Sequence, residues 1–462
     1  MKKIITLFIV LLSASLSAQD ITGKWQGNLV LPNGKLKLVV NIEPGVGGYT
    51  GTMDSPDEGA KGVPIEKITF NDNNFTFAIP AGDISYKGKL DNGVIKGTYT
   101  QGAYILELNL SREGAAEQKA KRPQEPVAPF PYYTEDVTFK NEKAGITLAG
   151  TLTLPKKNGN YPTVILISGS GTQDRNEEIL GHKPFLVLSD FLTRKGYGVL
   201  RYDDRGAGKS GGNPADKTSG DFATDTQAAL DYLKTRAEVN KKKIGLIGHS
   251  EGGLIAQLIA GKNTDIAFIV MLAGLGIQGS ELMVLQNYLV GKADGIPENE
   301  LTTMGTTIRK VYNVITTEND QKIRKATVSD ILDKEFTPFF ISKGVPKDEI
   351  GRVVSAQTEQ LTSPWFVYFL RYDPAPVVAK IKCPIFALNG SKDIQVAADA
   401  NLDGLKRIAE KSANKKVLTK KYMGLNHLFQ ECTTGSIQEY ETIEQTISPV
   451  VLNDIADWIA KQ

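Results

Sequence analysis

One short stretch limits the fold of this chain more than any other. It runs from Lys243 to Ala256 and reads KIGLIGHSEGGLIA. An apolar run passes through a Gly-x-Ser-x-Gly pattern directly into a helical pattern, which predicts a strand that turns sharply into a helix, with Ser250 at the tip. Gly248 and Gly252 suit this turn because side chains there would collide with the neighbouring strand and helix. The alternative is an ordinary strand–turn–helix junction with a chance serine.

Strand and helix patterns alternate on both sides of this stretch. Apolar runs at Tyr161–Ile167, Gly198–Tyr202 and Pro384–Leu388 are typical of strands buried on both faces. The alternation predicts a mostly parallel, doubly wound α/β sheet over residues 134–462. It stops at about 278–373, where the pattern is helical throughout. A helical insertion between two parallel strands predicts a cap over the strand ends, where such folds bind ligands.

The region before this domain has a different pattern. Residues 20–112 contain short segments with period-two alternation, separated by turn signals, which predict seven or eight strands in a small antiparallel barrel or sandwich. Residues 113–133 are charged and then proline-rich, as expected of a linker. We expect five aromatic side chains to fill the core of the β domain rather than to bind a ligand: Trp25, Phe70, Phe75, Phe77 and Tyr86.

The first eighteen residues have the composition of a signal peptide. Two lysines precede a short apolar run, and small residues surround an expected cleavage after Ala18. We therefore expect an exported protein, periplasmic or secreted, without a membrane anchor. A formal net charge of +2 suggests neither nucleic acid nor a membrane surface as a partner.

Neither a metal nor another cofactor is expected. The sequence has only three histidines, and no His/Cys cluster has metal-ligand spacing. Export would permit a disulfide between Cys383 and Cys432, but two free thiols are the favoured interpretation.

Three residues that follow predicted strands have the chemistry of a nucleophilic site. An activated serine needs a base, and the base needs an orienting acid. Ser250, Asp393 and His427 occur in the chain order Ser, Asp, His, each after a strand. Parallel strands could bring these residues to one edge of the sheet. Asp373 and Asp403 are the alternative acids, although neither directly follows a strand.

Backbone donors for an oxyanion are predicted at two positions. The N–H of Glu251 lies at a helix N-terminus, where the helix dipole favours developing negative charge. The second donor should come from the loop after Ile167, which reads SGSGTQDR, and either Ser170 or Gly169 could supply it. His249 is expected to pack beneath the turn.

The motifs together resemble the α/β-hydrolase superfamily. The segments GSGTQDRN, LRYDDRGAGKSGG, IGLIGHSEGG, LNGSKDIQV and GLNHLFQ occur in that order. They are most similar to bacterial serine carboxylesterases that carry an extra N-terminal β domain and a helical cap. The resemblance implies a catalytic triad of Ser250, Asp393 and His427. Glu251 departs from the pattern, because many such esterases have a small or apolar residue after the nucleophile.

These observations predict an exported serine hydrolase that cleaves small-molecule carboxylic esters through an acyl-enzyme. Two alternatives remain open. One is a peptidase or aminopeptidase of the same fold, although the β domain is too short to be a propeller that gates peptides. The other is a carbohydrate- or lipid-binding surface protein whose hydrolase domain is inactive, and the complete set of triad residues argues against it.

Overall fold

The structure is a computed structural model that describes residues 21–31, 34–56, 60–102, 104–112, 121–342, 347–412 and 414–462. The expected signal peptide and residues 113–120 of the expected linker lie outside these ranges. The described residues divide into two compact units: the first contains the described residues up to Arg112, and the second contains residues 121–341 and 347–462. Each unit has its own hydrophobic core.

The described residues of the first unit form one antiparallel sheet. Its strands are β1 (Gly23–Leu31), β2 (Gly34–Gly45), β3 (Gly48–Ser55), β4 (Ala60–Ile65), β5 (Lys67–Asn71), β6 (Asn74–Ile79), β7 (Ile84–Asp91), β8 (Val94–Gln101) and β9 (Tyr104–Arg112). They lie in the order β4-β3-β2-β1-β9-β8-β7-β6-β5.

One face of this sheet is buried, because side chains in a strand alternate between the two faces. In β6 the side chains of Phe75 and Phe77 are buried, and Thr76 between them is less buried. Trp25 and Tyr86 fill the same core, and Phe70 packs against it while partly exposed. The aromatic residues therefore contribute to the core, as predicted.

The two ends of the sheet approach each other. β3 contacts β5, and β4 contacts β6, although these strands are not neighbours in the sheet order. A Cβ atom placed on Gly51 of β3 would lie 2.9 Å from Ile68 Cδ1 of β5. The sheet is thus barrel-like, which is one of the two architectures predicted from the sequence.

The second unit contains a mixed, mostly parallel sheet. Its strands are β10 (Tyr133–Asn141), β11 (Ile146–Leu154), β12 (Tyr161–Ile167), β13 (Gly198–Tyr202), β14 (Val239–His249), β15 (Phe268–Leu272), β16 (Ile385–Gly390) and β17 (Val417–Tyr422). The order is β10-β11-β13-β12-β14-β15-β16-β17. β10 pairs antiparallel with β11, and β11 antiparallel with β13, whereas the remaining neighbours pair in parallel.

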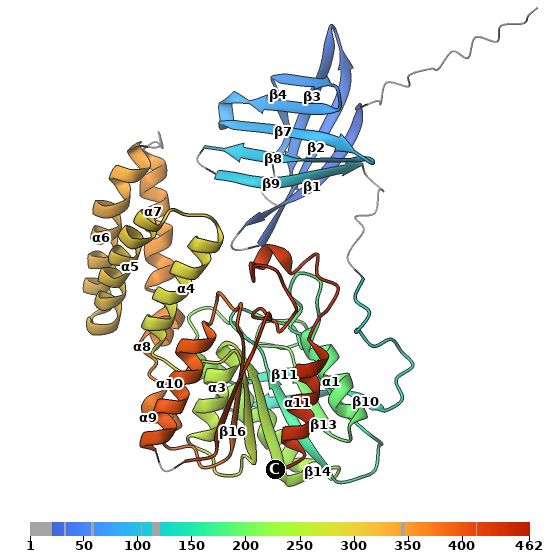
Figure 1. Ribbon diagram of the computed structural model, residues 1–462, viewed down its shortest axis with the longest axis vertical. Helices are drawn as coiled ribbons and strands as arrows, with labels where there is room; N and C mark the ends of the chain where they lie inside the picture. Colours follow the sequence, from blue (N-terminus) through green and yellow to red (C-terminus); the bar gives the residue numbers. More distant parts are fainter. Residues whose placement is uncertain are drawn as a thin grey trace, which may run out of the picture. The chain divides into compact units, whose positions relative to one another are not determined.

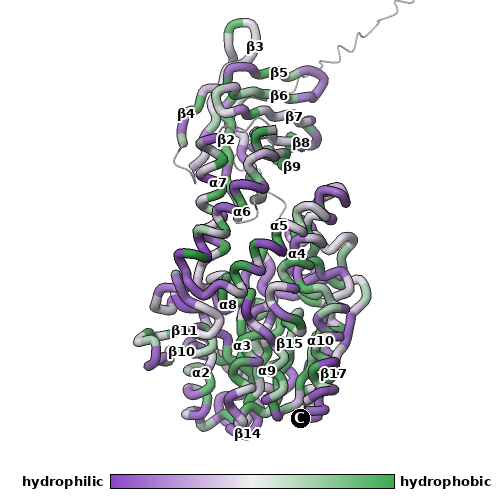
Figure 2. Tube along the Cα trace, turned by 90° about the vertical axis from the view of Figure 1, so that its left-hand side faces the viewer, coloured by the Kyte–Doolittle hydropathy of each residue, from purple (hydrophilic) through white to green (hydrophobic). Residues whose placement is uncertain are grey.

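Helices cover both faces of this sheet (Figure 1). They are α1 (Pro184–Arg194), α2 (Ser219–Thr235), α3 (Glu251–Ala260), α9 (Ala375–Val378), α10 (Ala398–Lys411) and α11 (Pro449–Ile459). α1 contacts α11 on one face, and α2, α3, α9 and α10 form a continuous row of contacts on the other. The central strands are buried on both faces, so the interior of the unit is apolar in Figure 2. The doubly wound architecture predicted from the sequence is confirmed.

A helical segment interrupts the sheet between β15 and β16. It contains α4 (Gly279–Ala293), α5 (Glu298–Thr317), α6 (Gln321–Ser342), α7 (Lys347–Leu361) and α8 (Pro364–Arg371). β15 and β16 are nevertheless adjacent parallel strands, so the segment leaves the sheet and returns beside its starting point. α8 contacts α2, α4, α5 and α7, which joins the segment to the helical layer over the sheet. Among the described helices, none has both the length and the hydropathy needed to cross a membrane.

Candidate active site

The predicted sharp turn joins β14 to α3. Ser250 occupies its tip with φ 52° and ψ −116°, a backbone conformation that is strained for a residue with a side chain. A Cβ atom on Gly248 would lie 2.1 Å from the carbonyl oxygen of Gly252, and one on Gly252 would lie 2.1 Å from that of Ile167. Only glycine fits at these two positions, and this close packing holds the strained serine in place.

Asp393 and His427 lie together in the loops after β16 and β17. Asp393 Oδ2 is 2.8 Å from His427 Nδ1, and each residue is only 4% exposed. The other carboxylate oxygen, Oδ1, accepts the backbone N–H groups of Gln395 and Val396, each at 2.8 Å. These bonds fix the carboxylate, so it can hold the imidazole in one orientation and one tautomer.

All three candidate residues follow parallel strands, and their loops therefore start at the same edge of the sheet. His249, which directly precedes Ser250, lies against the loop of the candidate base: its ring centroid is 4.7 Å from that of His427. The alternative acids lie elsewhere on the surface. Asp373 is exposed and accepts the N–H of Ala375, and exposed Asp403 pairs with a lysine.

The two proposed donors in the loop after β12 differ in their hydrogen bonds. The N–H of Gly169 donates to Glu177 Oε1 at 2.6 Å, so it is not free to bind an oxyanion. This bond argues against Gly169 and leaves Ser170 as the remaining candidate from this loop. The N–H of Glu251 starts α3, where the first turn of a helix has no partner within the helix.

Glu251 has a side-chain role that the sequence did not reveal. Its carboxyl group is buried, and Oε1 accepts from Ser219 Oγ at 2.6 Å and from Trp365 Nε1 at 2.9 Å. Burial raises the pKa of Glu251, against the opposing effect of the hydrogen bonds from Ser219, Trp365 and Ser170. Because Trp365 belongs to α8, this acid joins the start of α3 to the helical insertion.

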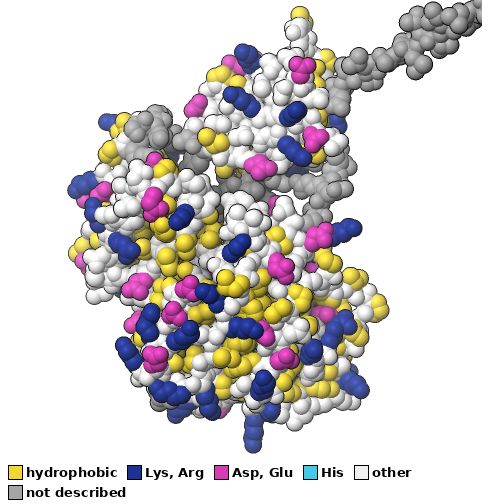
Figure 3. All heavy atoms as spheres, in the orientation of Figure 1, with side chains coloured by type: hydrophobic (Ala, Val, Ile, Leu, Met, Phe, Trp, Pro, Cys, Tyr) yellow, Lys and Arg dark blue, Asp and Glu magenta, His cyan; other side chains and the backbone are white. Residues whose placement is uncertain are grey.

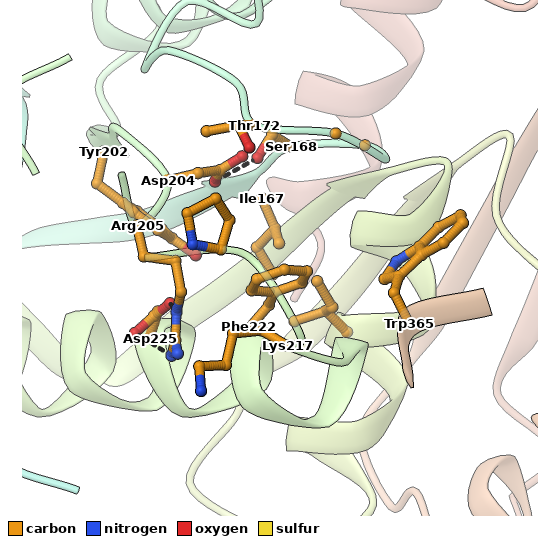
Figure 4. Close-up of a pocket in the computed structure, with 14 residues that line it drawn as sticks. Ile167, Ser168, Thr172, Tyr202, Asp204, Arg205, Lys217, Phe222, Asp225 and Trp365 are labelled. Carbon is orange, nitrogen blue, oxygen red and sulfur yellow. Dashed lines mark hydrogen bonds and ion pairs between the residues drawn. The ribbon is translucent and has the colours of Figure 1, made fainter. Parts of the chain in front are cut away.

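A cavity of about 250 Å³ lies beside the turn and is shown in Figure 4. Ile167, Phe222 and Ile255 supply apolar wall, and the indole of Trp365 closes one side. Asp204 also lines it and accepts from Ser168 Oγ at 2.7 Å. Burial raises the pKa of Asp204 to about 7. The cavity can therefore accept an apolar group next to the turn that carries Ser250.

The other two histidines, His182 and His249, are buried like His427, and no histidine is visible on the face drawn in Figure 3. Acidic and basic side chains are interspersed on that face. His182 is held by Thr446 Oγ1 at 3.0 Å and by the carbonyl of Tyr440 at 2.7 Å, and burial lowers its pKa. It does not line the cavity and has a structural role. His249 packs beneath the turn, as predicted, but its partner Glu177 was not foreseen.

The described ranges contain no group of three or more side chains arranged to hold a metal ion. Cys383 and Cys432 are free thiols, as the sequence favoured. Burial raises the pKa of both, that of Cys383 to about 11, so neither is a reactive thiolate at neutral pH.

The topology of the second unit and its sharp serine turn are those of the α/β-hydrolase fold. A family model described as serine aminopeptidase, S33, matches residues 184–332. Esterase EstD of Thermotoga maritima is 24% identical over 391 residues, which cover 84% of this chain and 79% of the esterase.

Two further proteins match a smaller share of this chain. The putative hydrolase YtaP of Bacillus subtilis is 34% identical over 133 residues, which cover 25% of this chain and 44% of that protein. Among solved structures, the Pyrococcus furiosus esterase Pf2001 is similar with a TM-score of 0.42 and 17% identity, over 71% of this chain and 93% of that chain.

Proposed function

We propose that this hydrolase is a serine esterase that cleaves carboxylic esters with Ser250 as nucleophile, His427 as general base and Asp393 as orienting acid. The observation that carries the proposal is the buried 2.8 Å contact between Asp393 Oδ2 and His427 Nδ1. The ring of His427 also lies against His249, the residue that precedes Ser250 in its strained turn. The relative EstD, which is named an esterase, supports the same reaction class.

The reaction follows from the hydrogen-bonding roles. Ser250 Oγ attacks the ester carbonyl carbon while His427 Nε2 takes its proton, and the electron pair of the C=O bond moves to oxygen. The N–H groups of Glu251 and Ser170 stabilise this oxyanion. Collapse of the intermediate expels the alcohol, which receives the proton from His427. Water, activated by the same imidazole, then releases the acid and restores the serine.

The cavity beside the turn supports an apolar group as one part of the substrate. Its wall includes Trp365 from the helical insertion, so we infer that the cap at 278–373 sets the size of the group that fits. Either the acyl chain or the alcohol of the ester could enter the cavity. Hydrolysis rates for esters in which the acyl chain and the alcohol are varied separately distinguish the two.

An aminopeptidase is the second candidate, because the matching family model carries that description. An aminopeptidase must bind a substrate ammonium group, and a carboxylate is the usual partner for such a cation. The two acids beside the turn do not suit this role. Glu251 is occupied by Ser219 and Trp365, and burial raises the pKa of both Glu251 and Asp204, which disfavours their charged forms. The ester reaction is therefore the better-supported proposal.

Export remains a proposal that is supported by the composition of residues 1–18. The mature protein should begin at Gln19 and fractionate outside the cytoplasm. N-terminal sequencing of protein from the periplasm and the medium tests this, and an intact Met1 in a cytoplasmic fraction would contradict it.

A substrate panel tests the function. Chromogenic esters of increasing acyl length should be hydrolysed by the wild type and not by Ser250→Ala, and aminoacyl anilides should be poor substrates. Hydrolysis of anilides at rates above those of every ester would favour the peptidase. Ester hydrolysis that survives in Ser250→Ala would overturn the proposed nucleophile.

A further inference from the structure

A second acid–histidine pair lies under the proposed active site. Glu177, in the loop after β12, is 1% exposed and has φ 52°. Its Oε1 accepts two hydrogen bonds: the N–H of Gly169 at 2.6 Å and His249 Nδ1 at 2.9 Å. The proposed mechanism assigns no step to this buried acid, although its position at the base of the reactive turn calls for an explanation.

The partners of His249 determine its protonation state. Nδ1 faces the Glu177 carboxylate, and Nε2 lies 3.2 Å from the carbonyl oxygen of His427. Both partners are acceptors, and a neutral imidazole has only one N–H to donate. With Glu177 ionised, the ring satisfies both contacts only as an imidazolium with a proton on each nitrogen.

Electrostatics agree with this geometry. The side chain of His249 is buried, and burial alone would lower its pKa. The charge and hydrogen bond of Glu177, the carbonyl of His427 and the charge of Asp393 outweigh burial, so the pKa of His249 is raised. A buried cation is stable where a hydrogen-bonded anion accompanies it, as Glu177 does here.

The pair joins three parts of the proposed machinery. Glu177 holds the loop that carries Ser170 through the N–H of Gly169, and His249 belongs to the turn that carries Ser250. Through Nε2, His249 also holds the backbone of the proposed base, His427. Among the described residues, no other hydrogen-bonded pair of side chains contacts the loops of Ser170, Ser250 and His427 together.

We propose that Glu177 and His249 are positioning residues, a buried ion pair that keeps the oxyanion loop, the nucleophile turn and the base loop in register. The proposal rests on the proposed function. If His249 lost a proton, a lone pair on one ring nitrogen would face the carbonyl of His427 or the Glu177 carboxylate. The repulsion would displace the base loop, and a shift of about 1 Å in such a site costs roughly 100-fold in rate.

Kinetics of Glu177→Gln test this proposal. The amide keeps the shape of Glu177 and one acceptor for Gly169, but removes the charge that stabilises the imidazolium. We expect kcat to fall by roughly 10- to 100-fold with KM within about twofold, because substrate contacts remain. Glu178→Gln is the matched control, since the neighbouring acid is exposed, and it should keep wild-type kinetics.

Nitrogen NMR of histidine-labelled protein reports the protonation state of the His249 ring. This state would not change in Glu177→Gln if Glu177 served only to pack the loop. The sequence has three histidines, so the imidazole signals are few enough to assign. In the wild type at pH 7.5, His249 should carry protons on both ring nitrogens, and in Glu177→Gln it should carry one. The wild-type measurement needs no variant, so it stands even if Glu177→Gln fails to fold.

The outcomes separate this inference from the proposed function. If a fluorophosphonate fails to label Ser250 in the wild type, the proposed function is wrong. If it labels Ser250 while His249 is neutral in the wild type, or while Glu177→Gln keeps wild-type kcat, the positioning pair is wrong and the esterase proposal stands. A doubly protonated His249 together with a selective loss of kcat supports the pair.

Discussion

Asp393 Oδ2 lies 2.8 Å from His427 Nδ1, and two backbone N–H groups hold the other oxygen of the same carboxylate. The acid therefore cannot rotate away without leaving buried donors unpaired. An imidazole fixed at Nδ1 in this way presents Nε2 as its free nitrogen, which is the arrangement a general base requires.

The first prediction concerns this pair. His427→Ala should lower kcat by roughly 10⁵- to 10⁶-fold, and Asp393→Asn by roughly 10⁴-fold, because the asparagine leaves a placed ring in the wrong tautomer. The double variant should be little worse than His427→Ala, since the same proton transfer is lost once. Steady-state kinetics measure all three. Asp373→Asn is the exposed control, and a large loss there with an active Asp393→Asn would reassign the acid.

The second prediction concerns the glycine at the base of the turn. Gly252→Ala should lower the free energy of unfolding by about 1–3 kcal/mol or more, because the new Cβ would lie 2.1 Å from the carbonyl oxygen of Ile167. Gly351→Ala is the matched control. Gly351 is an exposed helical position where an added Cβ would meet no other part of the chain within 4 Å, so alanine there should stabilise by about 0.5–1 kcal/mol. Urea denaturation measures both, and equal effects would contradict the close packing described for the turn.

The third prediction concerns the link between Glu251 and Trp365. Glu251→Ala leaves the indole N–H and the Ser219 hydroxyl without their acceptor, which costs about 1–3 kcal/mol per buried group. We expect Trp365 to shift and kcat/KM to become less selective among acyl chains. Glu251→Gln keeps an acceptor oxygen and should lose far less selectivity. Identical profiles for the two variants would show that the link does not shape the cavity.

The fourth prediction concerns Asp204, whose pKa burial raises to about 7 from an ordinary value of 3.8. The folded state binds this proton more tightly than the unfolded state does. Its contribution to stability is therefore complete below about pH 4 and is lost as the pH rises through 7, at about 1.4 kcal/mol per pH unit between the two pKa values. Asp204→Asn should reduce the loss of stability between pH 5 and pH 7.5. Denaturation at a series of pH values measures this, with exposed Asp216→Asn as the control; an unchanged slope in Asp204→Asn would contradict the raised pKa.

Local patterns predicted most of the secondary structure because each strand or helix buries one face at its own period. The strands predicted at Tyr161–Ile167 and Gly198–Tyr202 have the observed bounds. β4 was not predicted, since AKGVPI contains both glycine and proline, which are rare within strands. α8 lies within the region 278–373 that the sequence predicted to be helical.

The part of the site that the sequence could not reveal depends on long-range contacts. Ser250, Asp393 and His427 follow strands in a recognisable order, so each has a local signal. Glu177 has none: it is one acid in a charged loop, and its importance arises from burial against His249, which is 72 residues away in the chain. Trp365 reaches Glu251 across 114 residues in the same way.

Covalent labelling tests the central claim most directly. A fluorophosphonate should add one phosphonyl group per chain, on the tryptic peptide Ile244–Lys262, whose only serine is Ser250. Mass spectrometry locates the adduct, and both Ser250→Ala and His427→Ala should prevent it or slow it severely. An unmodified Ile244–Lys262 peptide in protein that hydrolyses esters, or an adduct on a different serine, would contradict the account.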